Sequence, residues 1–332
     1  MPDCGKHDLS CPKTTMFPLS GVTDRRNGEA GRTVRHRARH RWQRLSGAVR
    51  HRLFGGVRAH RVPLRWIRRA EIAPGDRVCL FVLLPRGGKV LPHSLDHVAA
   101  WRAAGYRVVV VAAVGSIDAP VDLSPLEGVE GLAVRLNKGY DFGAWAAMIA
   151  GLAASLEKAA VVALANDSVL GPSHRFAAML ERVERADADV LGLIENRQIR
   201  RHLQSFVLFF KAGALRADAF RRFWGGVRSG DRTYVIEFYE TALLATFAHA
   251  GLGVAALFPM ADPDGHNPTL TRWRELIEDG FPYLKVQLFR DNPFSVPLDG
   301  WHAAAERGGF DVAALDRQIA ALKQDGREQW QV

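Results

Sequence analysis

The sequence predicts an α/β protein in which a mostly parallel, twisted sheet is covered by helices. From residue 77 onward, short runs rich in β-branched residues alternate with segments of helical periodicity, as in successive β-α units. Polar residues stop several of these runs abruptly, at the strand ends where open sheets of this kind bind ligands. Apolar residues make up 48% and charged residues 24% of the 332 residues, which is typical of a globular protein with a large core.

Each element follows from its local pattern. The runs RVCLFVLL and YRVVVVAA are short and rich in β-branched residues, so they predict strands, whereas the longer segments between such runs predict helices. The predicted strands are residues 77–84, 106–113, 132–136, 160–165, 190–194, 205–210 and 254–258. The predicted helices are residues 93–104, 144–157, 174–185, 214–224 and 238–250.

The longest uncharged run, residues 241–261, has 21 residues and is long enough for a membrane span. It contains His249, Gly251, Gly253 and Pro259. These residues favour a helix that ends at Gly251 and is followed by a buried strand, and we prefer this interpretation to a membrane span.

The net charge of +10 is concentrated in one segment. Residues 25–69 hold fifteen arginines and a single acidic residue, Glu29, whereas acidic residues outnumber basic ones by 31 to 28 in residues 70–332. A nucleic-acid-binding fold is expected to carry its positive charge on the folded surface. We therefore expect no nucleic-acid partner.

Four parts are expected along the chain. Residues 1–30 are rich in Pro, Gly, Ser, Thr and Asp without periodicity and predict a disordered tail. Residues 31–70 form a basic, Arg-rich leader, residues 71–300 the α/β domain, and residues 301–332 a C-terminal helical extension.

The leader has helical periodicity, because Trp42, Leu45, Val49 and Leu53 are spaced as on one face of a helix. Arginine on one side and apolar residues on the other are typical of a helix that lies on an anionic membrane surface, although a solvated arm is an equal alternative. Three cysteines are too few for a disulfide framework, and the first 24 residues contain no signal-peptide pattern. We expect a cytoplasmic protein that is peripheral on the inner face of the membrane.

The first polar loop at a predicted strand end is RLNKGYDFGAW, residues 135–145. Gly139 permits a tight turn, and Asp141 stands just before an apolar helix. Asp141 either caps that helix or, together with Asn137, hydrogen-bonds a ligand above the strand ends.

The second polar loop lies in VVALANDSVLGP, residues 161–172, where an apolar strand stops at Asn166, Asp167 and Ser168. Polar groups at the end of a buried strand are costly unless they meet a ligand, a metal or one another. An Asp-Ser turn is the alternative. We favour a ligand site, because a carboxylate there can hold a divalent cation, Mg²⁺ or Mn²⁺, that neutralises a nucleotide diphosphate.

Five motifs, in order, resemble the rhamnan synthesis protein F family: NKGYDFGAW, NDSVLGP, HLQSFVLFF, YETALL and HNPTLTRWRELIEDGFPYLKVQLFRDNP. The resemblance covers about residues 77–297. It implies a glycosyltransferase of GT-A-like architecture in bacterial cell-surface polysaccharide synthesis. In the simplest case such an enzyme moves rhamnose from a nucleotide-diphosphate sugar onto a growing glycan or a lipid-linked acceptor.

The resemblance also implies roles for single residues. Asp167 stands where such folds place the carboxylate that meets the metal and the sugar-nucleotide phosphates, and His266 lies in a late loop suited to return a ligand to that metal. The usual Asp-x-Asp pair is absent, because Ala165 occupies the earlier position. Direct hydrogen bonding of Asp167 to the ribose or the donor sugar is therefore the alternative.

An inverting transfer needs a base that takes the proton of the acceptor hydroxyl. Glu240, at the head of a predicted helix, is the expected base and Glu237 the second choice; each is equally well explained as a first-turn glutamate favoured by the helix dipole. Further substrate-binding residues are expected in the later motifs. They are Gln204 and Ser205 of HLQSFVLFF and, as partners of phosphate, Arg201 and Lys285.

A second function is also compatible with the sequence, namely a non-catalytic glycan-binding or assembly factor that keeps the fold but has lost turnover. Its support is the missing first aspartate of the metal pair and the first loop, LLPRGGKV, residues 83–90, which departs from the family pattern.

Overall fold

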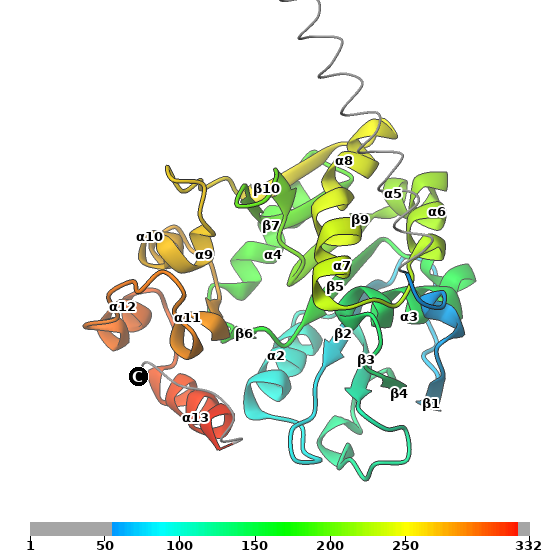
Figure 1. The fold of residues 1–332 in the computed structure, drawn as a ribbon, viewed down its shortest axis with the longest axis horizontal. Coiled ribbons are helices and arrows are strands. Elements are labelled where there is room, and N and C mark those ends of the chain that lie inside the picture. The colour runs from blue at the N-terminus through cyan, green and yellow to red at the C-terminus, as the bar shows by residue number, and fades with distance from the viewer. Residues whose placement is uncertain (1–54, 325–332) are drawn as a thin grey trace, which may run out of the picture. The chain divides into compact units, whose positions relative to one another are not determined.

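The computed structural model describes residues 55–324. The expected tail, residues 1–30, and most of the expected leader, residues 31–54, lie outside the described residues. The disorder of the tail and the membrane contact of the leader therefore stay predictions. The described residues form a mixed α/β fold around a central sheet, drawn in Figure 1.

The central sheet has the strand order β1-β4-β3-β2-β5-β9-β7-β10, and the short β8 pairs with β7. Strands β2 to β5 pair in parallel, and β9 lies antiparallel between β5 and β7, so that β7 and β10 run in the same direction as β2 to β5. The prediction of a mostly parallel sheet is confirmed. The strands are β1 (Leu64–Arg68), β2 (Arg77–Leu83), β3 (Arg107–Val114), β4 (Gly131–Leu136), β5 (Val161–Asn166), β7 (Val190–Asn196), β8 (His202–Leu203), β9 (Val207–Lys211) and β10 (Val254–Phe258).

Helices cover both faces of this sheet. The longer ones are α2 (Pro92–Ala103), α3 (Tyr140–Leu156), α4 (Phe176–Arg185), α6 (Asp218–Gly226), α8 (Thr241–His249) and α13 (Val312–Lys323). The shorter ones are η1 (Ala59–Arg61), η2 (Ser124–Leu126), α5 (Ala212–Arg216), α7 (Arg232–Val235), the π-turn η3 (Ile236–Glu240), α9 (Pro268–Thr271), α10 (Trp273–Glu278), α11 (Val286–Arg290) and α12 (Trp301–Arg307).

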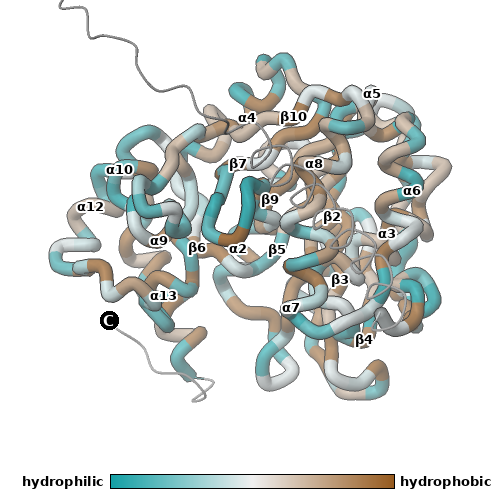
Figure 2. Tube along the Cα trace, turned by 45° about the horizontal axis from the view of Figure 1, so that its top comes forward, coloured by the Kyte–Doolittle hydropathy of each residue, from teal (hydrophilic) through white to brown (hydrophobic). Residues whose placement is uncertain are grey.

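Both faces of the sheet are buried, which explains why its strands are continuous apolar runs in the sequence. In β2, Leu80 packs into the cluster that holds Trp145 of α3, whereas the next residue, Phe81, packs into the cluster that holds Trp101 of α2. This change of face follows from the two-residue period of a strand. Figure 2 shows the hydrophobic residues concentrated in the central strands.

Several helix boundaries differ from the predicted ones. The helix predicted from residue 144 begins at Tyr140, because Gly139 adopts a φ of 81° and starts the helix there. The helix predicted over residues 214–224 is divided into α5 and α6 by the extended backbone of Ala217. The helix predicted over residues 238–250 begins as the π-turn η3 before α8.

The last residues of the expected leader, residues 64–68, pair with the central sheet. Residues 64–68 form β1, an antiparallel edge strand on β4, and not part of a leader helix. The indole of Trp66 lies against Gly151 of α3, where an added Cβ would come within 3.4 Å of the ring. This half-buried strand covers the edge of the sheet, so the α/β body begins before residue 71.

The C-terminal part of the chain packs against the segment that follows β5, at one side of the central sheet (Figure 1). β6 (Val169–Leu170), which directly follows β5, pairs antiparallel with β11 (Leu284–Lys285) in a small second sheet. The buried Gln318 of α13 accepts a hydrogen bond from the backbone N–H of Gly171 at 3.0 Å and donates one to Asp96 at 2.7 Å. These contacts fix the C-terminal helices against the segment that follows β5.

The uncharged run of residues 241–261 does not form one long helix. It contains α8, which ends at His249, and then β10. Within residues 55–324, no helix has both the length and the apolar character that crossing a membrane requires.

Candidate functional site

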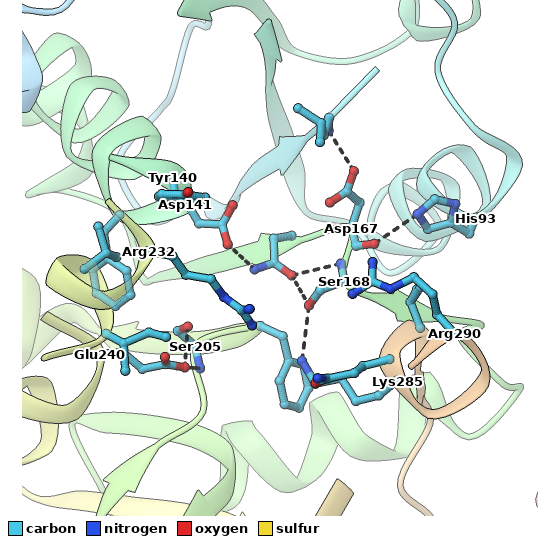
Figure 3. Close-up of a pocket in the computed structure, with 18 of the residues that line it drawn as sticks. His93, Tyr140, Asp141, Asp167, Ser168, Ser205, Arg232, Glu240, Lys285 and Arg290 are labelled. Carbon is cyan, nitrogen blue, oxygen red and sulfur yellow. Dashed lines mark hydrogen bonds between the residues drawn. The ribbon is translucent and has the colours of Figure 1, made fainter. Parts of the chain in front are cut away.

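A cavity of about 290 Å³ lies at the carboxyl ends of β2 and β5, beside the segment that leads into β9 (Figure 3). We call it the central pocket. Its size and concave form suit a small-molecule ligand. The charged and polar side chains that line it are Arg86, His93, Tyr140, Asp141, Asn166, Asp167, Ser168, Ser205, Arg232, Glu240, Lys285, Gln287 and Arg290.

Asn166 organises the end of β5 and is buried. Its Nδ2 donates to Oδ2 of Asp141 at 2.7 Å, and its Oδ1 accepts from the hydroxyl of Ser168 at 2.7 Å and from the backbone N–H of Ser168 at 3.1 Å. The two polar loops that the sequence singles out therefore meet through one amide. Asp141 stands in the first turn of α3 and turns its carboxylate to the pocket.

Asp167 is hydrogen-bonded to the residue that follows the neighbouring strand β2. Its Oδ2 accepts a hydrogen bond from the backbone N–H of Leu84 at 2.7 Å, just beyond β2. Its main-chain carbonyl lies 3.0 Å from Nε2 of His93. Burial lowers the pKa of His93 to about 4, so the ring is neutral near pH 7, and Nε2 carries the proton that this carbonyl accepts.

Burial also raises the pKa values of the two aspartates. The pKa of Asp141 rises to about 6, opposed by the hydrogen bond from Asn166, and the pKa of Asp167 rises to about 7, opposed by the N–H of Leu84 and increased by the charge of Asp141. Carboxyl groups with perturbed pKa values in a concave site are characteristic of ligand-binding and catalytic centres.

Lys285 enters the pocket because β11 pairs with β6, which places it opposite Val169. Its Nζ donates to the hydroxyl of Ser168 at 3.2 Å and lies 4.1 Å from the ring centroid of Phe206. Burial of the ammonium lowers its pKa to about 8. The neighbouring charges of Asp141 and Glu240 oppose this change.

Glu240 is the last residue of the π-turn and faces the pocket from the side of α8. Its Oε1 accepts hydrogen bonds from the hydroxyl of Ser205 at 2.9 Å and from the backbone N–H of Ser205 at 3.2 Å. Ser205 lies beside the end of β5, because β9 is antiparallel to β5 and starts at the same edge of the sheet. The carboxylate of Glu240 is thereby held at a fixed position.

The central pocket thus brings together many of the residues that the sequence predicts for the site. They are Asp141, Asn166, Asp167, Ser168, Ser205, Glu240 and Lys285.

Other predicted residues do not line this pocket. Asn137 is exposed at the end of β4. Gly139 supplies the left-handed turn before α3 and packs closely against Ser229, where a Cβ would come within 3.1 Å of Cα. Glu237 lies in the π-turn, and its main-chain carbonyl accepts a hydrogen bond from the hydroxyl of Thr241 at 3.0 Å.

Two predicted substrate-binding residues have structural partners outside the pocket. The buried Gln204 donates from Nε2 to Oδ1 of Asn267 at 2.6 Å and so holds a late loop. Arg201 pairs with the carboxylate of Glu195 at 2.7 Å.

The structure places Asp167 and His266, the two residues expected to share a metal, in different pockets. His266 lies in a separate pocket with Asp262, while Asp167 lines the central pocket. In the part of the chain that the structure describes, one group of three His, Cys, Asp or Glu side chains has the spacing of a cation site: Asp262, Asp264 and His266. The carboxylate of Asp262 accepts backbone N–H bonds from Asp264 and His266 and a hydroxyl bond from Thr271, and this pattern orders the loop.

Two carboxylates of the central pocket are partly engaged by hydrogen bonds within the protein. One oxygen of Asp167 is occupied by the N–H of Leu84 and one oxygen of Asp141 by the amide of Asn166. Within residues 55–324, neither aspartate belongs to a group of three or more His, Cys, Asp or Glu side chains whose potential ligand atoms are spaced for a cation.

The sequence alone did not single out six other polar or charged lining residues, which are Arg86, His93, Tyr140, Arg232, Gln287 and Arg290. Arg86 lies in the loop LLPRGGKV, which departs from the family pattern, and Arg290 lies near the end of the last of the five motifs, in RDNP. His93 and Arg232 carry no motif, and only the folded chain places them.

Tyr140 also lines the pocket, and its backbone has a φ of 51°. A residue other than glycine is strained in this region, and such strain concentrates at functional sites.

Comparisons with known proteins agree with the motifs. The profile of the rhamnan synthesis protein F family matches residues 120–313. The virulence protein VirA of Vibrio anguillarum is 26% identical over an alignment of 197 residues, and the match covers 49% of this chain and 63% of VirA. The uncharacterized protein y4gN of Sinorhizobium fredii is 26% identical over 133 residues, 39% of this chain and 35% of y4gN.

This chain therefore spans less than two thirds of the length of either relative. The matched family region contains the pocket residues from Tyr140 to Arg290, whereas Arg86 and His93 precede it. Because the family profile covers more than half of the chain, this protein belongs to the rhamnan synthesis protein F family.

Proposed function

We propose that this protein is a glycosyltransferase of GT-A-like architecture. It would transfer a sugar, in the simplest case rhamnose, from a nucleotide-diphosphate sugar to a growing surface polysaccharide or a lipid-linked acceptor. The observation that carries this proposal is the central pocket, where Asp141, Asn166, Glu240 and Lys285, from four separate family motifs, converge at the carboxyl ends of parallel strands. The family's link to rhamnan synthesis supports a role in polysaccharide synthesis.

The pocket residues supply the groups that sugar transfer needs. In an inverting transfer, an acceptor oxygen attacks the anomeric carbon and forms the new glycosidic bond, while the bond from that carbon to the phosphate oxygen breaks and the diphosphate leaves with the electron pair. The carboxylate of Glu240, fixed by Ser205, takes the acceptor proton. Asp141 and Asp167 line the same pocket and would hydrogen-bond hydroxyl groups of the donor.

The test is a panel of deoxythymidine, uridine and guanosine diphosphate sugars, assayed for thermal stabilisation and for release of the nucleotide diphosphate. One sugar nucleotide should stabilise and be turned over, and Asp167→Ala should abolish turnover and alter the surface glycan of cells. Asp187→Ala removes an exposed carboxylate outside the pocket and serves as the matched control.

A protein that neither binds nor hydrolyses any member of the panel, together with an unchanged surface glycan for Asp167→Ala, would refute the proposal. Binding of glycan without binding of nucleotide would instead support the non-catalytic assembly factor.

A further inference from the structure

We infer that the central pocket holds the diphosphate of its ligand with the cationic side chains of Lys285, Arg232 and Arg290, and that this binding needs no divalent metal. The inference rests on the proposed function for the identity of the ligand, a nucleoside diphosphate or its sugar ester. The anion subsite itself is argued from the residues of the pocket.

Lys285 is the centre of this subsite. Its ammonium is half-buried above the ring of Phe206, and its hydrogen bond goes to a neutral hydroxyl, that of Ser168. Within residues 55–324, no carboxylate forms an ion pair with it, although the charges of Asp141 and Glu240 act on it from a distance. A cation removed from water without an ion partner is costly, and a phosphate oxygen would supply the missing partner.

Arg232 faces the same space. It is the first residue of α7, it is exposed, and in Figure 3 its guanidinium extends toward the middle of the pocket. Its charge disfavours the protonated form of Lys285, so the two cations repel each other across the pocket. Two like charges that converge on one space favour an anion between them, and a guanidinium can bind phosphate with two parallel N–H bonds.

Arg290, the last residue of α11, lines the same pocket and adds a third positive charge. Its guanidinium makes two contacts with the neighbouring carboxylate of Asp291, at 2.9 and 3.1 Å, which set its orientation. The segment RDNP therefore has a role in the pocket as well as in the turn that follows it.

The carboxylates of the pocket are not arranged to hold a metal beside these cationic side chains. The carboxylate of Asp167 is bonded to Leu84, and in Figure 3 it points away from Lys285 and Ser168. The first position of the usual aspartate pair is Ala165, fully buried inside β5. Cationic side chains are thus the groups that can neutralise a leaving diphosphate here.

The experiment is calorimetric titration of the full-length protein with nucleoside diphosphates and with inorganic pyrophosphate, each in EDTA and in Mn²⁺. We expect binding in EDTA with an affinity within about threefold of that in Mn²⁺. Lys285→Gln and Arg232→Gln should each weaken binding about tenfold or more, which is the effect of losing a charge-assisted hydrogen bond. Lys138→Gln removes an exposed lysine that does not line the pocket and should bind like the wild type.

A second variant separates loss of the ligand contact from misfolding. Lys285→Met keeps the stem over Phe206 but removes the unpaired charge, so the ligand-free variant should melt at the same or a higher temperature while it binds pyrophosphate more weakly. A variant that melts lower and binds as tightly as the wild type would contradict the assignment.

The outcomes distinguish the inference from the proposed function. Nucleotide binding that requires Mn²⁺, or that is indifferent to Lys285 and Arg232, overturns the inference and leaves the glycosyltransferase in place. Pyrophosphate binding in EDTA that depends on both residues, without binding of any nucleotide sugar, supports the anion subsite and overturns the proposed function. Failure of every probe to bind refutes both.

Discussion

The substitution Asp167→Asn should make the folded protein more stable near neutral pH. In the wild type, burial raises the pKa of Asp167 from 3.8 to about 7, so keeping this carboxylate charged opposes folding. Asparagine has almost the same shape, and its Oδ1 can still accept the N–H of Leu84. The variant therefore removes the buried charge without removing the hydrogen bond that positions the loop.

The size of the effect follows from the change in pKa. Each pKa unit corresponds to about 1.4 kcal/mol, so the full change amounts to about 4 kcal/mol. Asp167 keeps partial contact with solvent and shares its titration with Asp141, and we therefore expect about 2 kcal/mol. For a folded body of this size, that corresponds to a rise in Tm of about 3–4 °C.

The sign depends on pH. Because the folded pKa of Asp167 lies above the unfolded value of 3.8, the stability associated with its protonated form is fully present below that value and is lost as the pH rises through about 7. The asparagine variant does not lose it. The difference in Tm between variant and wild type should hence be near zero at about pH 4 and grow to its full size at about pH 8.

Thermal unfolding followed by circular dichroism between these pH values measures the effect. Asp187→Asn, an exposed carboxylate outside the pocket, is the matched control and should show no such pH-dependent gain. An Asp167→Asn variant that is no more stable than the wild type at about pH 8 would refute the reasoning. In that case solvent or a bound ion stabilises the charged carboxylate.

Three further predictions concern the site and the two ends of the fold. Glu240→Gln should lower the rate of transfer about 100-fold or more, while the nucleotide still binds, if this carboxylate is the base; an undiminished rate would exclude that role. Gln318→Ala leaves the backbone N–H of Gly171 unsatisfied and should cost about 1–3 kcal/mol in urea unfolding, whereas the exposed Arg317→Ala should cost little. Trp66→Ala should lower the free energy of unfolding by about 2 kcal/mol, and an unchanged urea midpoint would show that β1 adds no stability.

Much of the architecture was predictable, because local patterns decide local structure. The run that becomes β2 (Arg77–Leu83) has both faces buried, so a short continuous run of β-branched and other apolar residues predicts it as a strand. The edge strand β1 was missed for the converse reason. It is short and rich in arginine, and only half of its side chains pack on the body, so its charge dominated the pattern.

The candidate site was predictable where a polar residue directly ends a strand. Asn166 and Asp167 follow an apolar run, and a polar group at such a place requires a partner, so their importance could be inferred without the fold. His93 and Arg232 could not be inferred, since nothing in their neighbouring residues distinguishes a pocket side chain from a surface one.

The sequence by itself determined the order of strands and helices and the concentration of the excess positive charge in residues 25–69. It also determined that polar residues end β5 and form the loop before α3. Tertiary structure decided which of these polar groups meet. Lys285 and Ser168 are 117 positions apart and come together because β11 pairs with β6, while His266 is carried to a different pocket. Periodicity and charge are properties of neighbouring residues, whereas a binding site depends on the pairing of distant segments, and that pairing is set by packing of the whole core.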